Sequence, residues 1–137
     1  MIVPKKSLGQ NFLLDNNIIN KIINQTNIQN ENIVEIGPGY GGLTDKIISK
    51  NPKSLTLIEK DNEIFDYLNK KYQVKKNIKI INADILKYDF SKIRGIKIIS
   101  NLPYNVSTKI IMQLIFYNKN ITNLICMIQK ELATKFD

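Results

Sequence analysis

The sequence contains no histidine and only one cysteine, Cys126. Without histidine the chain cannot build the Ser-His or Cys-His pairs that activate many nucleophiles, and it lacks the side chain on which most zinc sites depend. One cysteine excludes a disulfide framework, and because Cys126 lies in an apolar run, we expect a reducing, intracellular setting. The residues of this sequence imply no metal site.

Long apolar runs are also missing. No stretch has the roughly 20 apolar residues that a membrane-spanning helix needs, and the N-terminus lacks the apolar core of a signal peptide. We therefore expect no membrane association and a cytoplasmic protein, or an organellar one if the source is eukaryotic.

The length of 137 residues and the 43% hydrophobic content predict one globular domain with a real core. This length is short for a complete doubly wound enzyme, so we expect a C-terminal part to be missing. The 20 Lys and Arg residues outnumber 12 Asp and Glu residues, which leaves a formal charge of +8 and favours a polyanion such as nucleic acid as partner. A proteome rich in Lys, Asn and Ile would produce the same balance without such a partner.

The most informative stretch is 32–44, where an apolar run meets a cluster of glycines and then a helical pattern. This order predicts a strand, a tight turn and a helix. Gly37 and Gly39, with Gly41 or Gly42, allow unusual backbone angles and let the backbone lie against a ligand. The following helix directs its free N–H groups and the positive end of its dipole at that ligand, which can be a carboxylate or a phosphate.

Two nucleoside cofactors fit this turn. Gly37, Gly39 and Gly42 satisfy G-x-G-x-x-G, and Glu59 lies about twenty residues further on, as the dinucleotide-binding fingerprint requires. The same residues fit the first loop of S-adenosylmethionine (SAM) methyltransferases, which holds the amino-acid end of that cofactor. A purely structural turn is the third possibility.

Acidic residues lie at the end of the predicted strand 54–59 and just after the next predicted strand, 77–82. Glu59 can accept hydrogen bonds from both hydroxyls of a ribose. Asp84 can accept one from the exocyclic amine of an adenine, while the neighbouring backbone N–H, at Ile85, serves a ring nitrogen. Surface acids at strand ends are the alternative, but two such acids beside a glycine turn outline a ribose and then a base.

The predicted strand 96–100 runs directly into Asn101-Leu102-Pro103-Tyr104. The amide oxygen of Asn101 and the carbonyl of Leu102 can both accept hydrogen bonds from an NH₂ group, and Pro103 stiffens the turn. Tyr104 offers a flat face on which a ring can stack. An ordinary β-turn would also accommodate this tetrapeptide. Its position after the two acids favours an amine-methylating site, and hence SAM over a nicotinamide.

The first 14 residues show neither helical nor strand periodicity and are expected to form an arm. Lys5 and Lys6 can meet phosphates, Asn11 can hydrogen-bond a ligand, and Leu13 can cover an aromatic ring. Residue types alone favour a frayed terminus over this role.

Apolar spacing predicts four helices that alternate with the strands, which gives an α/β doubly wound domain with a mostly parallel sheet. A fifth strand is expected over 124–129 and a further helix near Lys130. The residues expected to face inward are Ile18, Ile19, Ile22 and Ile23 after a cap at Asp15; Leu43, Ile47 and Ile48; Ile64, Phe65, Leu68 and Tyr72 after a cap at Asp61 or Asn62; and Ile110, Ile111, Leu114 and Ile115.

Taken in order, these motifs resemble the ribosomal RNA adenine N6,N6-dimethyltransferases, SAM-dependent enzymes with a Rossmann-like fold that methylate two adjacent adenosines near the 3′ end of small-subunit rRNA. The resemblance rests on KSLGQNFL (6–13), EIGPG (35–39), Leu43-Thr44, Glu59, Asp84, NLPYNVS (101–107) and MIQKE (127–131). It implies that Asn11, Leu13, Gly37, Gly39, Glu59, Asp84, Ile85 and Asn101 form the SAM site. The arm then belongs to the site and is not frayed, and the expected partner is a small-subunit precursor particle bound by a monomer.

Members of that family continue with two more strands and a small helical domain that helps to hold RNA. Residues 1–137 are therefore expected to be the methyltransferase domain alone. We expect its RNA binding, and its stability as an isolated domain, to be weaker than those of a longer protein. The implied chemistry is direct transfer, in which Asn101 and the Leu102 carbonyl orient the adenine N6 and no general base is indispensable.

Three rival functions remain open. A nicotinamide-dependent dehydrogenase explains the glycines and Glu59 but not the stretch 101–104. A non-catalytic RNA-binding relative that assists transcription or ribosome assembly would keep the basic charge. A DNA adenine-N6 enzyme fits the tetrapeptide equally well, and only the resemblance selects rRNA.

Overall fold

The computed structural model describes residues 16–73, 75–89, 96–101, 107–116 and 121–127. The elements in chain order are α1 (Asn16–Ile23), β1 (Asn32–Ile36), α2 (Gly42–Ser49), β2 (Ser54–Glu59), α3 (Asn62–Tyr72), β3 (Ile78–Asn82), the short 3-10 helix η2 (Ile85–Lys87), β4 (Ile96–Asn101), α4 (Ser107–Phe116) and β5 (Ile121–Met127). None of the helices in these ranges is long and apolar enough to cross a membrane.

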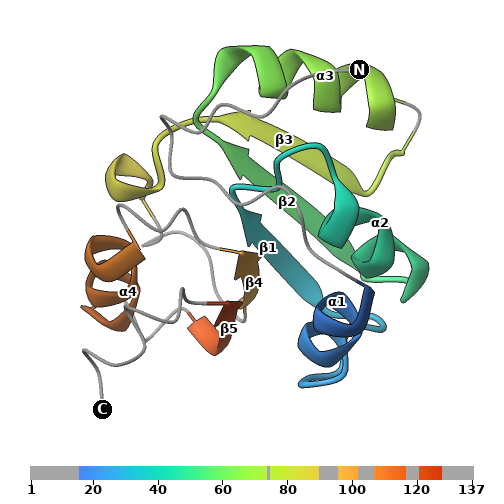
Figure 1. Ribbon diagram of the computed structural model, residues 1–137. Helices are drawn as coiled ribbons and strands as arrows, with labels where there is room; N and C mark the ends of the chain where they lie inside the picture. The colour runs from blue at the N-terminus through green and yellow to red at the C-terminus, as the bar shows by residue number, and fades with distance from the viewer. Residues whose placement is uncertain (1–15, 74, 90–95, 102–106, 117–120, 128–137) are drawn as a thin grey trace.

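The five strands form one sheet of order β3-β2-β1-β4-β5, and every neighbouring pair is parallel (Figure 1). Parallel neighbours cannot be joined by a hairpin, so the chain crosses over through helices. It runs outward from β1 to β3, returns to β4 beside β1, and then continues to β5. The strand order therefore reverses between β1 and β4, which is where open α/β sheets bind ligands. The predicted doubly wound α/β fold is confirmed.

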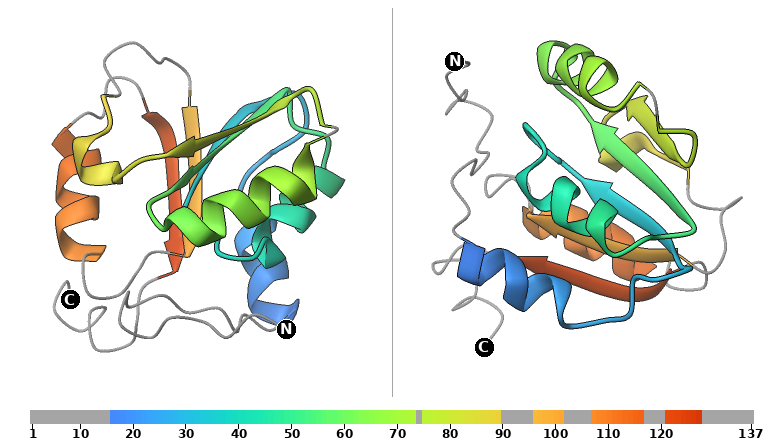
Figure 2. Two further views of the ribbon diagram at one scale, coloured as in Figure 1. Left: turned by 90° about the horizontal axis from the view of Figure 1, so that it is seen from above. Right: turned by 90° about the vertical axis from the view of Figure 1, so that its right-hand side faces the viewer.

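Helices cover both faces of the sheet (Figure 2). Buried residues of α1, α2 and α3 pack on one face, whereas α4 and η2 pack on the other. Side chains alternate along β1, so Ile33 joins the first cluster and Val34 and Ile36 join the second. By the same alternation Glu35 points towards the helices of the first layer, where a carboxyl group needs a hydrogen-bond partner.

Most of the predicted inward positions are confirmed, but the one at Ile18 is wrong. Ile19, Ile22 and Ile23 of α1 are buried, whereas Ile18 is 37% exposed. At 3.6 residues per turn, Ile18 lies about a quarter turn from the centre of the stripe formed by the other three. The cap at Asp15 and the side chain of Ile115 lie outside the described residues. Asp61 does cap α3, because its Oδ1 accepts a hydrogen bond from the Ile64 N–H at 2.9 Å.

The fifth strand begins earlier than predicted. It starts at Ile121 rather than at residue 124, and residues 128 and 129 lie outside the described part of the chain. Thr122 and Asn123 are exposed, so no apolar pattern marked this start. Backbone pairing with β4 sets it instead, helped by the Thr122 hydroxyl, which donates to the Ile96 carbonyl at 3.1 Å.

Candidate cofactor site at the carboxyl edge of the sheet

The register of the sheet brings the ends of four strands to one edge. Ile36, the last residue of β1, pairs with Ile58 on one side and with Ser100 on the other. Glu59 in turn pairs with Asn82, the last residue of β3. The predicted site residues that follow or end these strands, namely Gly37, Gly39, Glu59, Asp84, Ile85 and Asn101, therefore all belong to this edge.

The turn after β1 has the backbone conformation that its glycines predicted. Gly37, Gly39 and Gly41 have φ values of 63°, 58° and 96°. Residues other than glycine rarely adopt these backbone angles, because their Cβ would approach the following carbonyl oxygen too closely. The Gly37 N–H donates to the Ile58 carbonyl at 2.9 Å, which ties the start of the turn to β2. This turn requires glycine for its shape, whatever it binds.

The third glycine of the dinucleotide fingerprint is not used as that motif requires. Its role is to let the helix pack closely on the strand, yet a Cβ added at Gly42 would meet nothing within 4 Å. Gly42 is also absent from the residues with positive φ. Gly41 is the constrained position, because a Cβ there would lie 2.4 Å from the Tyr72 hydroxyl. The turn therefore departs from the dinucleotide pattern.

Glu59 is fully buried, and backbone N–H groups hold its carboxylate. Oε1 accepts from the Gly39 N–H at 3.3 Å, and Oε2 accepts from the Asp61 N–H at 2.9 Å. The first of these bonds links the tip of β2 directly to the glycine turn. The two bonds together fix the orientation of the carboxylate at the end of β2, beside the glycine turn.

Asp84 lies in the loop after β3 and caps η2. Its Oδ1 accepts from the Leu86 N–H at 3.0 Å, and its Oδ2 lies 3.7 Å from the Lys60 ammonium. The side chain is 24% exposed, so it is accessible to a ligand. Ile85 beside it is buried in the apolar cluster under α4. A polar acceptor next to an apolar surface is the combination that recognises the edge of a purine.

Asn101 is the last residue of β4 and is 9% exposed. The preceding residue, Ser100, donates its hydroxyl to the Ile36 carbonyl, which fastens the end of β4 to the end of β1. The amide of Asn101 is thereby held beside the glycine turn. Its predicted companions Leu102, Pro103 and Tyr104 lie outside the described residues, as do Lys5, Lys6, Asn11 and Leu13 of the arm.

Sequence reasoning missed a buried polar pair beneath the turn. The Thr44 hydroxyl, in α2, donates to Glu35 Oε1 at 2.5 Å, and both residues are buried. The pKa of Glu35 is raised to about 8, chiefly because the carboxyl group is buried. The Thr44 hydrogen bond opposes this shift, and the nearby negative charges of Glu59 and Asp45 add to it. The available signal was an acid inside the apolar run 33–36, which requires a local partner.

The described residues fit SAM by the chemistry of their donors and acceptors. Positive-φ glycines leave room for backbone contact with the amino-acid end of a ligand. The carboxylate at the tip of β2 suits a ribose, and the acid beside Ile85 suits an adenine amine. In the dinucleotide fingerprint the third glycine lets the helix pack closely on the strand, whereas a Cβ at Gly42 would meet nothing within 4 Å.

Solved structures with the same fold include RNA methyltransferases. The 23S rRNA methyltransferase ErmE aligns with a TM-score of 0.77 and 26% identity, covering 91% of this chain and 50% of its own. A dimethyladenosine transferase from Plasmodium falciparum aligns with a TM-score of 0.75 and 30% identity, covering 91% of this chain and 46% of its own. Together with the glycine turn and the strand-tip acids, these matches define a Rossmann-like methyltransferase domain.

The family is shown by sequence. The family model for ribosomal RNA adenine dimethylase matches residues 3–136, and the chain belongs to this family. Ribosomal RNA small subunit methyltransferase A of Pelagibacter ubique (strain HTCC1062) is 44% identical over 98% of this chain. The protein of that name from Hydrogenobaculum sp. (strain Y04AAS1) is 40% identical over 98% of this chain. The chain spans about half the length of these relatives, 52% and 53%.

Proposed function

We propose that this protein is a SAM-dependent methyltransferase that dimethylates N6 of two adjacent adenosines near the 3′ end of small-subunit rRNA and so supports ribosome biogenesis. One observation carries the proposal. The positive-φ glycine turn, the buried Glu59, the loop acid Asp84 and Asn101 all belong to one carboxyl edge of the sheet, at its switch point. Membership of the dimethylase family supports adenine as the target.

In this proposal the cofactor lies across the ends of β1, β2 and β3. The backbone of Gly37 and Gly39 contacts its amino-acid end, and Glu59 accepts hydrogen bonds from its ribose hydroxyls. Asp84 accepts from the adenine amine, and the Ile85 N–H donates to the ring. Asn11 and Leu13 of the arm complete the site. When bound, SAM supplies a methyl group made electrophilic by the positive sulfonium.

The target adenine is held at the end of β4. Asn101 and the Leu102 carbonyl accept hydrogen bonds from its N6, which directs the nitrogen lone pair towards the methyl group. Pro103 stiffens this turn and Tyr104 stacks on the base. The amine can lose its proton after attack, so these residues act by orientation rather than as a general base.

In this proposal the positive charge of the protein attracts the phosphates of its RNA partner. The formal charge of +8 favours a polyanion, and Lys5 and Lys6 are the groups proposed to meet phosphates near the site. The natural substrate in this proposal is a precursor particle of the small ribosomal subunit, bound by a monomer in the cytoplasm.

Calorimetric titration of the chain with SAM, S-adenosylhomocysteine and NAD tests the cofactor assignment. We expect saturable binding of the first two and none of NAD. Binding of NAD alone would favour a dehydrogenase, and RNA binding without SAM binding would favour a non-catalytic relative. Transfer is then tested with labelled SAM on small-subunit particles that lack N6-dimethyladenosine, followed by identification of the modified nucleosides.

A further inference from the structure

Side chains from the last turn of α3 contact both the glycine turn and the start of α2. The Lys71 ammonium donates to the Tyr40 carbonyl at 2.9 Å and lies 3.0 Å from Asp45 Oδ2. Tyr40 is in the middle of the turn, and Asp45 is in the first turn of α2. The Lys71 side chain is 29% exposed, so these contacts are partly shielded from water.

Tyr72, next to Lys71 in α3, makes a second contact with the start of α2. Its hydroxyl donates to Asp45 Oδ1 at 2.6 Å, so Lys71 and Tyr72 hold one carboxylate oxygen each. The hydroxyl also lies 3.5 Å from the Gly41 carbonyl oxygen. A Cβ at Gly41 would come within 2.4 Å of the Tyr72 hydroxyl and 2.9 Å of the Lys71 ammonium. A side chain at Gly41 would therefore displace the ends of both side chains, and it would also be strained by the φ of 96°.

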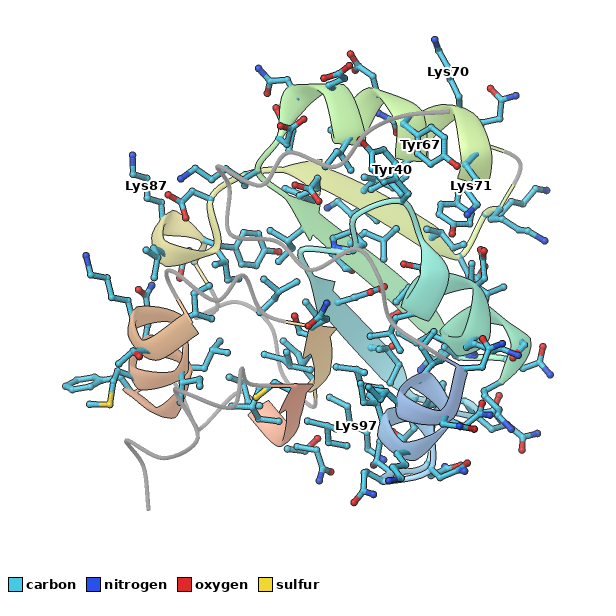
Figure 3. The ribbon with its side chains drawn as sticks, viewed as in Figure 1. Tyr40, Tyr67, Lys70, Lys71, Lys87 and Lys97 are labelled. Atoms are coloured by element: carbon cyan, nitrogen blue, oxygen red, sulfur yellow. The ribbon has the colours of Figure 1, made fainter. Side chains whose placement is uncertain are left out.

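Aromatic rings hold the Lys71 ammonium in place. The Tyr40 and Tyr67 rings meet edge to face, with centroids 5.1 Å apart and planes at 83°. The ammonium lies 5.9 Å from the centroid of the Tyr67 ring and 5.3 Å from that of Tyr72. Such distances allow a cation–π attraction. Figure 3 shows Lys71 beside Tyr40 and Tyr67, whereas the neighbouring Lys70 projects away from the molecule.

These contacts act on the part of the chain that most needs them. A turn with glycines at three positive-φ positions has a wide choice of conformations when nothing holds it. A ligand that binds only one conformation loses affinity in proportion to the fraction of molecules in other ones. Lys71 and Tyr72 fix the turn at Tyr40, Gly41 and Asp45, away from the bond between Gly39 and Glu59.

We propose that Lys71 and Tyr72 are positioning residues for the cofactor, which hold the glycine turn in its binding conformation and raise SAM affinity without contacting SAM. The inference rests on the proposed function, because it requires that the glycine turn binds SAM. Neither residue belongs to the set that contacts the ligand in that proposal, and both come from the end of α3.

The matched test compares Lys71→Met with Lys70→Met, since both remove one positive charge from adjacent positions of α3. Tyr72→Phe removes the hydroxyl and keeps the ring. Because each variant loses such a hydrogen bond, the affinities of Lys71→Met and Tyr72→Phe for SAM and S-adenosylhomocysteine should fall by about tenfold. Lys70→Met should bind as the parent does. Calorimetry is done well below each melting temperature, where every variant is folded.

Amide hydrogen exchange of Gly39 and Gly41, measured without ligand, reports the turn directly. It should be faster in Lys71→Met and Tyr72→Phe and unchanged in Lys70→Met. Parent-like SAM affinity in both variants, or an equal loss in Lys70→Met, would overturn the positioning role. Lower melting temperatures with unchanged affinity would assign the contacts to stability alone. Failure of the parent to bind SAM contradicts the proposed function itself and is thereby distinguished.

Discussion

The Thr44 hydroxyl donates a hydrogen bond to the Glu35 carboxyl group, and this bond joins the first turn of α2 to β1 beneath the glycine turn. Both residues are almost completely buried, at 0% and 1% exposure. A carboxylate in this position would be short of solvation, which is why burial raises the pKa of Glu35 to about 8. Near neutral pH the group is therefore mainly protonated and serves the fold as a neutral polar side chain.

The first prediction concerns pH. The groups that shift the pKa of Glu35 besides burial are Thr44, through its hydrogen bond, and Glu59 and Asp45, through their negative charges. Because the pKa of Glu35 in the fold exceeds its ordinary value of 4.5, its contribution to stability is complete below pH 4.5 and is lost as pH rises through about 8. The melting temperature of the parent should fall across this window.

Glu35→Gln tests this, because the amide stays neutral and can still accept from Thr44. Thermal melts of the variant should show a smaller fall in melting temperature between about pH 5 and pH 9 than those of the parent. Parallel curves for the two proteins would mean that Glu35 does not titrate in this range.

The strands and the glycine turn were predictable because their information is local. An apolar run that ends at a glycine or an acid marks β1 and β2. The bounds of β2 agree with the predicted strand 54–59, and β1 lies within the stretch 32–44 where a strand was expected. Contacts between distant parts of the chain were not predictable. Thr44 and Glu35 are 9 residues apart in the sequence, whereas Lys71 and Tyr40 are 31 residues apart. No pattern in the sequence predicts the contact between Lys71 and Tyr40. The start of β5 was missed for a related reason, since its first residues are set by pairing with β4.

The second prediction separates the glycines of the turn. Gly37→Val places a branched side chain at a φ of 63°, a conformation that costs an L-residue about 1–2 kcal/mol. It should lower both the melting temperature and the SAM affinity. Gly42→Ala is the control, because its Cβ would meet nothing within 4 Å. Alanine there should leave SAM affinity unchanged and stabilise α2 slightly. Normal SAM binding in Gly37→Val would refute the role of the turn.

The third prediction concerns the adenine end of the cofactor. Asp84→Ala removes the proposed acceptor of the adenine amine and should weaken SAM by about 1–3 kcal/mol. It also removes the cap of η2, in which Oδ1 accepts from Leu86. Asp84→Asn retains an oxygen for that cap and separates the two effects. Asp66→Ala changes the same charge on the exposed side of α3 and should bind SAM as the parent does. Equal affinities in Asp84→Ala and Asp66→Ala would contradict the adenine assignment.

The fourth prediction concerns RNA. If phosphate contacts dominate, the association constant for small-subunit rRNA should be low and should fall linearly with salt on a logarithmic plot, with a slope of roughly 0.7–0.9 per phosphate neutralised. Replacing Lys5 and Lys6 by glutamine should reduce that slope by about one to two. Lys53→Gln is the control, because Lys53 precedes β2 at the opposite edge of the sheet. Tight binding that does not respond to salt would show that base contacts within this chain suffice.

The last prediction separates catalysis from cofactor binding and is made for a protein extended to the length of its relatives. Tyr104→Phe keeps the aromatic face and should retain most methyl transfer. Tyr104→Ala removes a stacking platform worth roughly 1–3 kcal/mol per base, and it should depress transfer while SAM still binds. Asn101→Ala should be more severe, because it removes an acceptor that orients the amine in the transition state and contacts the cofactor site.

An ordinary structural turn at 101–104 predicts a different pattern for the same variants. Asn101 ends β4, and the Ser100 hydroxyl fastens that strand to β1, so a turn needed only for folding would lose stability and activity together. Thermal melts are therefore run beside the transfer assay. Melting temperatures near that of the parent with lost transfer support the catalytic role, because the site is then intact but the amine is no longer held. Full activity in Tyr104→Ala would refute the stacking role, since no other residue in this proposal supplies a face for the target base.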